Sequence, residues 1–129
     1  MASGGELIFR AAPHPRYGWL LVRLRVGRAA ENLVFDMAIS TLTPVTALSV
    51  AARNLLLRTG YLVTLPQRAD RYLLRDPQIE GQPFPDLEVG VSAFAGRAGV
   101  DGLLGLNFFE RFVDVRLNLP TLEFTLGEP

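Results

Sequence analysis

An acidic residue stands in the middle of an apolar stretch in the first third of the chain. The stretch runs from Asn32 to Ser40, and Asp36 lies between Leu33-Val34-Phe35 and Met37-Ala38-Ile39. A carboxylate among so many apolar side chains loses hydration, which is costly unless other groups hold the charge. Any fold that this chain adopts must therefore provide partners for Asp36.

Most of the remaining sequence consists of short segments in which apolar and polar residues alternate. Residues 17–26, 87–93 and 113–119 have this pattern, which is typical of half-buried strands. A turn after residue 26 leads into 31–35, so that Asp36 is expected at the end of a hairpin. Prolines and glycines separate the segments, and the sequence predicts a mainly β fold.

Two segments are expected to be helical, and one further hairpin is expected between them. Residues 44–57 carry apolar side chains at helical spacing, with Thr43 as a cap, Pro44 at the first helical position and a stop at Gly60. A short helical turn is expected at 107–111. Residues 61–74 read as two strands joined by a polar tip.

Composition excludes several classes of function. The 129 residues include 49% hydrophobic and 20% charged residues, and the formal net charge is zero, which argues against nucleic acid as a partner. No apolar run approaches the ~20 residues that a membrane-spanning helix needs, and the first residues do not resemble a signal peptide. We therefore expect a single domain over 1–129, in a cytoplasmic protein with no membrane partner.

The absence of some residue types narrows the chemistry further. Cysteine is missing, so thiolate nucleophiles and cysteine-based metal sites are excluded, and we expect neither a metal nor a cofactor. The only histidine, His14, lies between Pro13 and Pro15, which predicts an exposed loop and a surface side chain. Any acid–base chemistry would then depend on carboxylates.

A second apolar stretch gives the chain a family resemblance. It runs from Val100 to Phe109 and contains Leu103-Leu104-Gly105-Leu106-Asn107-Phe108. Together, and in this order, the two stretches resemble the retropepsin-like aspartic peptidases. That family has Asp-Thr/Ser-Gly-Ala-Ser after an apolar strand and Leu-Leu-Gly-Leu/Met-Asp/Asn-Phe near its end. The resemblance implies a closed retropepsin-like β-barrel with one main helix, preceded by an N-terminal segment, 1–16, as an edge or interface strand.

The resemblance also implies a site. Asp36 would be the catalytic carboxylate, and hydrolysis by two carboxylates requires them to share a proton about 3 Å apart. Because one chain supplies one such motif, the second Asp36 would come from a homodimer partner. The hairpin 61–74 would be either a flap over a peptide or protein substrate or a solvated loop. The substrate-binding residues that follow from this comparison are Ala38, Ser40, Arg68, Ala69 and Asp70.

The sequence departs from the family motif directly after the aspartate. Met37 and Ala38 stand where the family has Thr/Ser and Gly. Met37 offers no hydroxyl and Ala38 adds a methyl group, and a misplacement near 1 Å can cost on the order of a hundredfold in rate. Two hypotheses follow: an aspartic endopeptidase whose activity is weak or lost, or a non-catalytic retropepsin-fold module for peptide binding or dimerisation.

Overall fold

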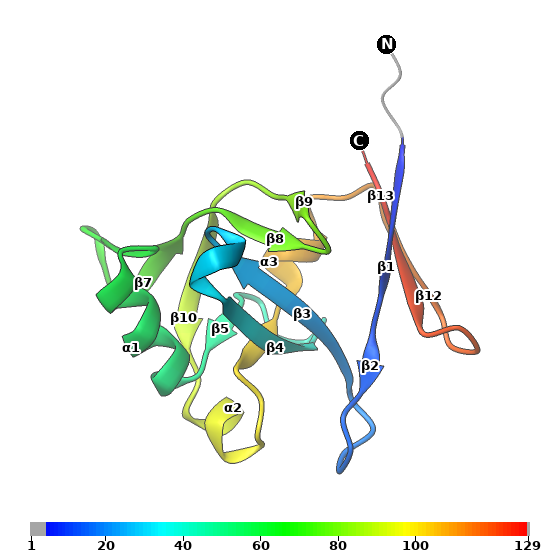
Figure 1. The fold of residues 1–129 in the computed structure, drawn as a ribbon, viewed down its shortest axis with the longest axis horizontal. Coiled ribbons are helices and arrows are strands. Elements are labelled where there is room, and N and C mark those ends of the chain that lie inside the picture. The colour runs from blue at the N-terminus through cyan, green and yellow to red at the C-terminus, as the bar shows by residue number, and fades with distance from the viewer. Residues whose placement is uncertain (1–4, 129) are drawn as a thin grey trace.

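The computed structural model describes residues 5–128, and strands dominate it (Figure 1). The strands are β1 (Glu6–Arg10), β2 (Ala12–Pro13), β3 (Leu20–Val26), β4 (Leu33–Ile39), β5 (Ala47–Leu48), β6 (Leu62–Leu65), β7 (Arg68–Leu74), β8 (Pro77–Ile79), β9 (Gln82–Pro83), β10 (Leu87–Val91), β11 (Gly102–Leu104), β12 (Asp114–Asn118) and β13 (Glu123–Gly127). The helices are α1 (Val50–Thr59), α2 (Ala93–Arg97) and α3 (Leu106–Phe109), with a 3-10 turn, η1 (Ala29–Glu31).

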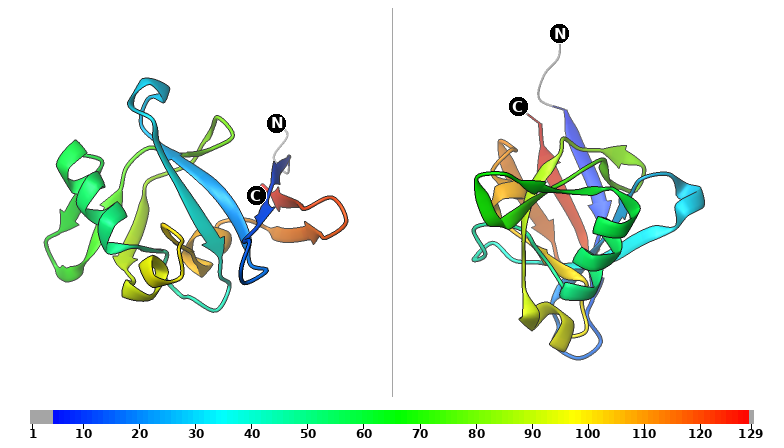
Figure 2. Two further views of the ribbon diagram at one scale, coloured as in Figure 1. Left: turned by 60° about the horizontal axis from the view of Figure 1, so that its bottom comes forward. Right: turned by 90° about the vertical axis from the view of Figure 1, so that its left-hand side faces the viewer.

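The main sheet is curled and open, so the expectation of a closed barrel was wrong. Its order is β6-β7-β10-β5-β11-β4-β3-β8-β9, with β2 paired to β3. Figure 2 shows the curl of the strands from two sides. Within residues 5–128 no strand pairing joins β6 to β9. Closure needs end strands that match in length and stagger, and β9 has only two residues to offer.

The hydrophobic core lies on the inner face of β3 and β4. These strands pair antiparallel, with Val22 opposite Met37 and Leu24 opposite Phe35, and all four side chains are buried. Alternate residues of a strand face opposite ways, so Asp36 points away from this core. The expected strand 31–35 was too short, because β4 continues through Asp36 to Ile39.

The main helix begins later than expected. The prediction was 44–57, whereas α1 runs Val50–Thr59. Residues 47 and 48 instead form β5, which pairs with β10 and β11. Ser49 caps the helix by accepting from the N–H of Ala52, and Gly60 ends it at φ 86°. Strand pairing on both sides of β5 outweighs the helical spacing of its residues.

Other predicted elements are present with shifted ends. The hairpin 61–74 forms as β6 and β7 and projects from the main sheet (Figure 1), and the turn expected at 107–111 appears as α3. Helix α2 was not expected. A separate three-stranded sheet has the order β1-β13-β12, so β1 is one of its two edge strands, whereas β2, from the same segment 1–16, pairs with β3 of the main sheet.

Candidate functional site

A turn stabilised by two hydroxyl groups follows the end of β4. The N–H of Ser40 donates to the carbonyl of Leu104 at 2.9 Å, and the N–H of Thr43 donates to the carbonyl of Ser40 at 3.3 Å. The side-chain oxygens of Ser40 and Thr43 lie 2.6 Å apart. This turn, residues 40–46, is therefore fixed at its start by β11 and by its own side chains.

Two glycines allow β11 to pass close to β4 and to the turn. Gly102 and Leu104 pair in parallel with Met37 and Ile39. A Cβ on Gly102 would lie 2.6 Å from Met37 Cε, and a Cβ on Gly105 would lie 2.7 and 2.8 Å from backbone atoms of the turn. At these distances a side chain on either glycine would collide with its neighbours, so both positions serve close packing. Gly105 faces the turn after Ile39, not Asp36.

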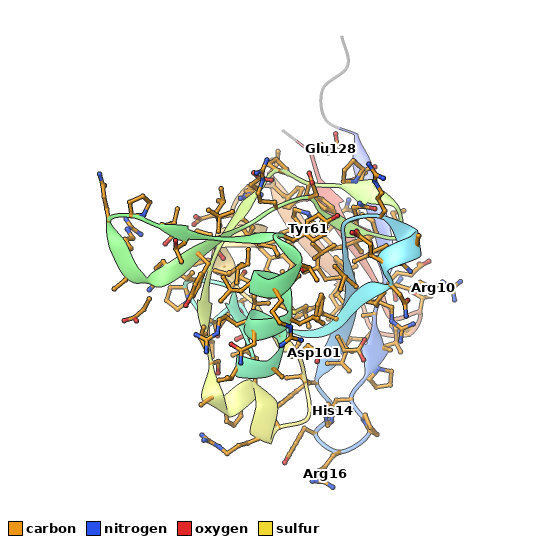
Figure 3. The ribbon with its side chains drawn as sticks, turned by 60° about the vertical axis from the view of Figure 1, so that its left-hand side comes forward. Arg10, His14, Arg16, Tyr61, Asp101 and Glu128 are labelled. Atoms are coloured by element: carbon orange, nitrogen blue, oxygen red, sulfur yellow. The ribbon has the colours of Figure 1, made fainter. Side chains whose placement is uncertain are left out.

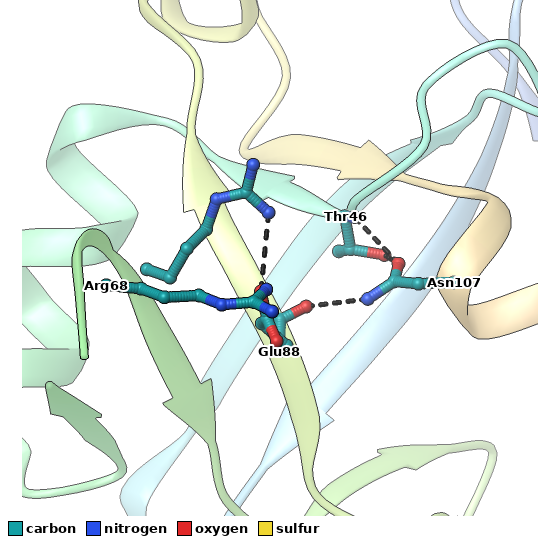
Figure 4. A network of polar contacts seen from close by, with 5 residues as sticks. Thr46, Arg68, Glu88 and Asn107 are labelled. Atoms are coloured by element: carbon teal, nitrogen blue, oxygen red, sulfur yellow. Dashed lines mark hydrogen bonds and ion pairs between the residues drawn. The ribbon is translucent and has the colours of Figure 1, made fainter. Parts of the chain in front are cut away.

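The far end of the turn is held by a polar network around Asn107 (Figure 4). Asn107 Oδ1 accepts from both the N–H and the hydroxyl of Thr46, each at 2.8 Å, and Asn107 Nδ2 donates to the carbonyl of Glu88 at 2.8 Å. Thr46 is fully buried, and its hydroxyl also accepts from the N–H of Gly105. The turn is thus connected to β10, β11 and α3.

An apolar hollow of about 280 Å³ opens beside the turn. Its polar atoms include the paired hydroxyls of Ser40 and Thr43. The residues that line it are Trp19, Ala38, Ile39, Ser40, Thr43, Phe94 and Leu103. Hollows with apolar walls and a few convergent polar groups are typical ligand sites. Two of the predicted substrate-binding residues, Ala38 and Ser40, therefore line one hollow.

The predicted residues of the hairpin lie elsewhere. Asp70 lines a different, more polar hollow of about 430 Å³, together with Arg53 and Arg71. Arg68 is engaged with Glu88, whose carboxylate lies 2.8 Å from Arg68 Nη1 (Figure 4), and Ala69 is exposed. The structure therefore brings Ala38 and Ser40 together, and it does not bring residues 68–70 into the same hollow.

Asp36 lies four residues before the turn, in the interior of β4. Its carboxylate is half exposed and lies 3.5 Å from Arg23 Nε on β3. Its N–H donates to Asp101 Oδ2 at 2.8 Å, and its carbonyl accepts from the N–H of Asp101 at 2.9 Å. The carboxylate of Asp36 thus has an arginine on the neighbouring strand as its partner, and its backbone is hydrogen-bonded to Asp101.

The prediction for His14 was wrong, because this side chain is buried at 9% exposure. Its ring packs against the rings of Tyr17 and Trp19, and Trp19 in turn packs against Phe94 on α2. Sequence reasoning missed this aromatic cluster and its place at the hollow. Trp19 and Phe94 are far apart in the chain, so no local pattern could have indicated their contact.

Residues 5–128 lack two further kinds of feature. No helix in this part of the chain is long and apolar enough to cross a bilayer. No group of three or more His, Asp or Glu side chains gathers there as metal ligands would.

Comparison with known proteins identifies the fold. No protein-family model matches the sequence, and no curated protein matches it. Among solved structures, the chain is similar to a retropepsin-like aspartic protease from Rickettsia conorii, with a TM-score of 0.61 and 20% sequence identity. The match covers 99% of this chain and 95% of that one. The chain therefore has the fold of the retropepsin-like aspartic proteases, as the order of its two apolar motifs predicted.

Proposed function

We propose that this chain is a non-catalytic, homodimeric peptide-binding module with the retropepsin-like fold. Its binding site would be the apolar hollow at the end of β4, and its ligand an extended peptide that places an apolar side chain there. The observation that carries the proposal is the position of Asp36 relative to the end of β4.

The family motif places its aspartate directly after an apolar strand. Here β4 ends at Ile39, so the residue in that position is Ser40, followed by Thr41 and Leu42. A serine hydroxyl does not ionise near neutral pH and cannot share a proton as a carboxylate does. A match of Ser40-Thr41-Leu42 to Asp-Thr-Gly keeps the threonine of the motif and loses the acid.

The surroundings of Asp36 also argue against paired-carboxylate hydrolysis. At this residue both edges of β4 are engaged, one by β3 and the other by Asp101. The carboxylate lies beside Arg23 in an ion pair within the same chain, whereas the mechanism needs two carboxylates that meet and share one proton. A second copy would have to displace Arg23 to reach Asp36.

The hollow itself supports peptide binding. Trp19, Phe94 and Leu103 supply apolar and aromatic walls, which contribute most of the binding energy in such sites. The hydroxyls of Ser40 and Thr43 lie within hydrogen-bonding distance of each other, and either can turn toward a peptide N–H or carbonyl. A volume of about 280 Å³ suits one or two side chains.

The proposed homodimer forms through β12, one of the two edge strands of the terminal sheet. The apolar residues of β12 and Val113, which precedes it, are exposed: Val113 at 70%, Val115 at 42% and Leu117 at 45%. If two copies of β12 pair antiparallel with Val115 at the centre, Asp114 lies opposite the partner's Arg116, and Val113 lies opposite the partner's Leu117. Residues opposite each other share a face, so this register joins opposite charges and apolar side chains at once.

Binding and cleavage can be measured on the same samples. Trp19 is the only tryptophan and lines the hollow, so its fluorescence should report the uptake of an apolar peptide. We expect saturable binding by the wild type, loss of binding in Leu103→Arg, and no change in Leu57→Arg, whose side chain is exposed on α1. Absence of saturable binding would contradict the proposal.

Cleavage of an unfolded protein from acidic to neutral pH tests the competing hypothesis. We expect no cleavage by the wild type or by Asp36→Asn. Cleavage by the wild type that disappears in Asp36→Asn would instead establish a peptidase that uses paired Asp36 carboxylates. The proposal of a non-catalytic module would then be wrong.

The dimer is tested by sedimentation at several protein concentrations. Val115→Asp should give a monomer, whereas Val63→Asp, an equally exposed site on β6, should leave the dimer intact. Asp114→Arg should also dissociate the dimer, and the exchange Asp114→Arg with Arg116→Asp should restore it. A dimer that survives Val115→Asp would exclude the β12 interface.

A further inference from the structure

The hydrogen bonds of His14 fix the protonation of its ring. His14 Nδ1 lies 3.0 Å from the backbone N of Arg16 and 3.2 Å from that of Tyr17, and both N–H groups donate to it. Backbone N–H groups only donate, so Nδ1 must be the unprotonated acceptor of a neutral imidazole. Nε2 then carries the proton and donates to the carbonyl of Ala98 at 3.1 Å.

These bonds join two parts of the chain at one side of the hollow. The loop between β2 and β3 begins at His14 and carries Arg16 at its tip (Figure 3), and Ala98 follows α2. The ring centroids of His14 and Trp19 lie 5.6 Å apart, and those of Trp19 and Phe94 of α2 lie 5.9 Å apart. Trp19 and Phe94 are walls of the hollow, so His14 holds that side of the site in place.

We propose that His14 is a pH-sensitive latch that closes the aromatic wall of the hollow when neutral and releases it when protonated. An imidazolium donates from both nitrogens, so a proton on Nδ1 would point at the N–H groups of Arg16 and Tyr17. Two acceptor bonds would be lost and replaced by a repulsive contact. Protonation of Nδ1 and closure of the loop therefore exclude each other.

The charged groups around His14 also disfavour a protonated ring in the closed loop. From the loop, Arg16 and the phenol of Tyr17 lie next to the ring, and from α2 Arg97 lines the hollow of about 450 Å³ beside it. Among the described residues that line this second hollow, none is a carboxylate. Among the residues lining this hollow, a positive imidazolium would thus find two arginines and no carboxylate, which adds to the tendency to open.

The consequence for the site is a loss of peptide affinity as the pH falls. Opening the loop removes Trp19 from its contact with Phe94 and takes away one wall of the hollow. We expect the affinity for an apolar peptide to fall roughly tenfold between pH 8 and pH 5, which corresponds to about 1.4 kcal/mol of binding free energy. This effect on binding rests on the proposed function, whereas the latch itself does not.

The experiment uses the only histidine and the only tryptophan of the chain as probes, without peptide. Nitrogen-15 NMR of His14 should show the tautomer with the proton on Nε2 at pH 8. The emission of Trp19 should shift to longer wavelength when the pH is lowered from 8 to 5. In His14→Gln, which cannot titrate, Trp19 emission should be constant over the same range.

Each outcome decides the proposal. A Nδ1–H tautomer at pH 8, or Trp19 emission that stays constant while His14 titrates, would overturn the latch even if His14→Gln failed to fold. A transition that persists in a folded His14→Gln variant would also overturn it. A Trp19 transition that follows His14 in a protein that binds no peptide at any pH would support the latch and refute only the proposed function.

Discussion

Replacing Asn107 with Ala should destabilise the protein strongly although the side chain is only half buried. Asn107 makes three side-chain hydrogen bonds of 2.8 Å, two to Thr46 and one to the carbonyl of Glu88. Alanine keeps the helical conformation of α3 but offers no partner to these groups. Thr46 is fully buried, so at least its backbone N–H would lose its acceptor without gaining water.

The size of the loss follows from the number of bonds. A hydrogen bond contributes about 1 kcal/mol net, and an orphaned buried donor costs about 1–3 kcal/mol. Because the hydroxyl of Thr46 can still rotate and water can reach the carbonyl of Glu88, we expect a total of about 3 kcal/mol. With an unfolding entropy of roughly 0.27 kcal/mol/K for a chain of 129 residues, the melting temperature should fall by roughly 11 °C.

Urea unfolding and calorimetry of both proteins measure this change. The matched control is Asn54→Ala, an exposed asparagine on α1 whose side chain bonds only the neighbouring Arg53. Its stability should change by less than about 0.5 kcal/mol. A loss below 1 kcal/mol in Asn107→Ala, with m-values equal to the wild type, would show that the network does not hold the turn of residues 40–46.

Three further predictions concern single contacts. Gly105→Ala should cost about 3 kcal/mol in urea unfolding, because its Cβ would lie 2.7 and 2.8 Å from backbone atoms that cannot move independently; a loss under 1 kcal/mol would contradict this packing. Tyr61→Phe removes the 2.6 Å hydrogen bond that is the largest cause of the lowered pKa of Glu31. A carboxyl whose pKa is lowered in the folded state adds stability at pH values above its unfolded pKa and loses that stability as the pH falls. The variant should therefore be less stable than the wild type at pH 7 and equal to it near pH 2. An equal deficit at both pH values would refute the linkage. Arg23→Ala should change the unfolding free energy by less than about 0.5 kcal/mol, because its pair with Asp36 is exposed, and a loss above 1 kcal/mol would show that this pair is structurally important.

Local patterns predicted the elements that bury one face and turn at glycine or proline. The alternation of residues 17–26 and 87–93 predicted two strands, which form as β3 (Leu20–Val26) and β10 (Leu87–Val91), and residues 61–74 form the expected hairpin. The order of the two apolar motifs predicted the retropepsin-like fold. In each case the signal lies within a few residues, because a strand with one buried face needs a period of two wherever it sits.

Long-range pairing decided the features that the sequence could not determine. Residues 44–49 have helical spacing, yet hydrogen bonds to β10 and β11 make 47 and 48 a strand. Pairing with β11 likewise extends β4 to Ile39, and this moves the turn from Asp36 to Ser40. Helix propensity contributes only tenths of a kcal/mol per residue, whereas each hydrogen bond between strands contributes about 1 kcal/mol, so a few such bonds override it.

The candidate site depends most on tertiary structure. By itself the sequence, through its family resemblance, indicated Ala38 and Ser40 as site residues, and its composition left carboxylates as the available acid–base groups. It could not determine that Trp19, Phe94 and Leu103 surround them, nor that His14 is buried against Ala98. These residues come from separate segments, and only the folded sheet brings them together, because side-chain contacts across strands follow from register and not from distance along the chain.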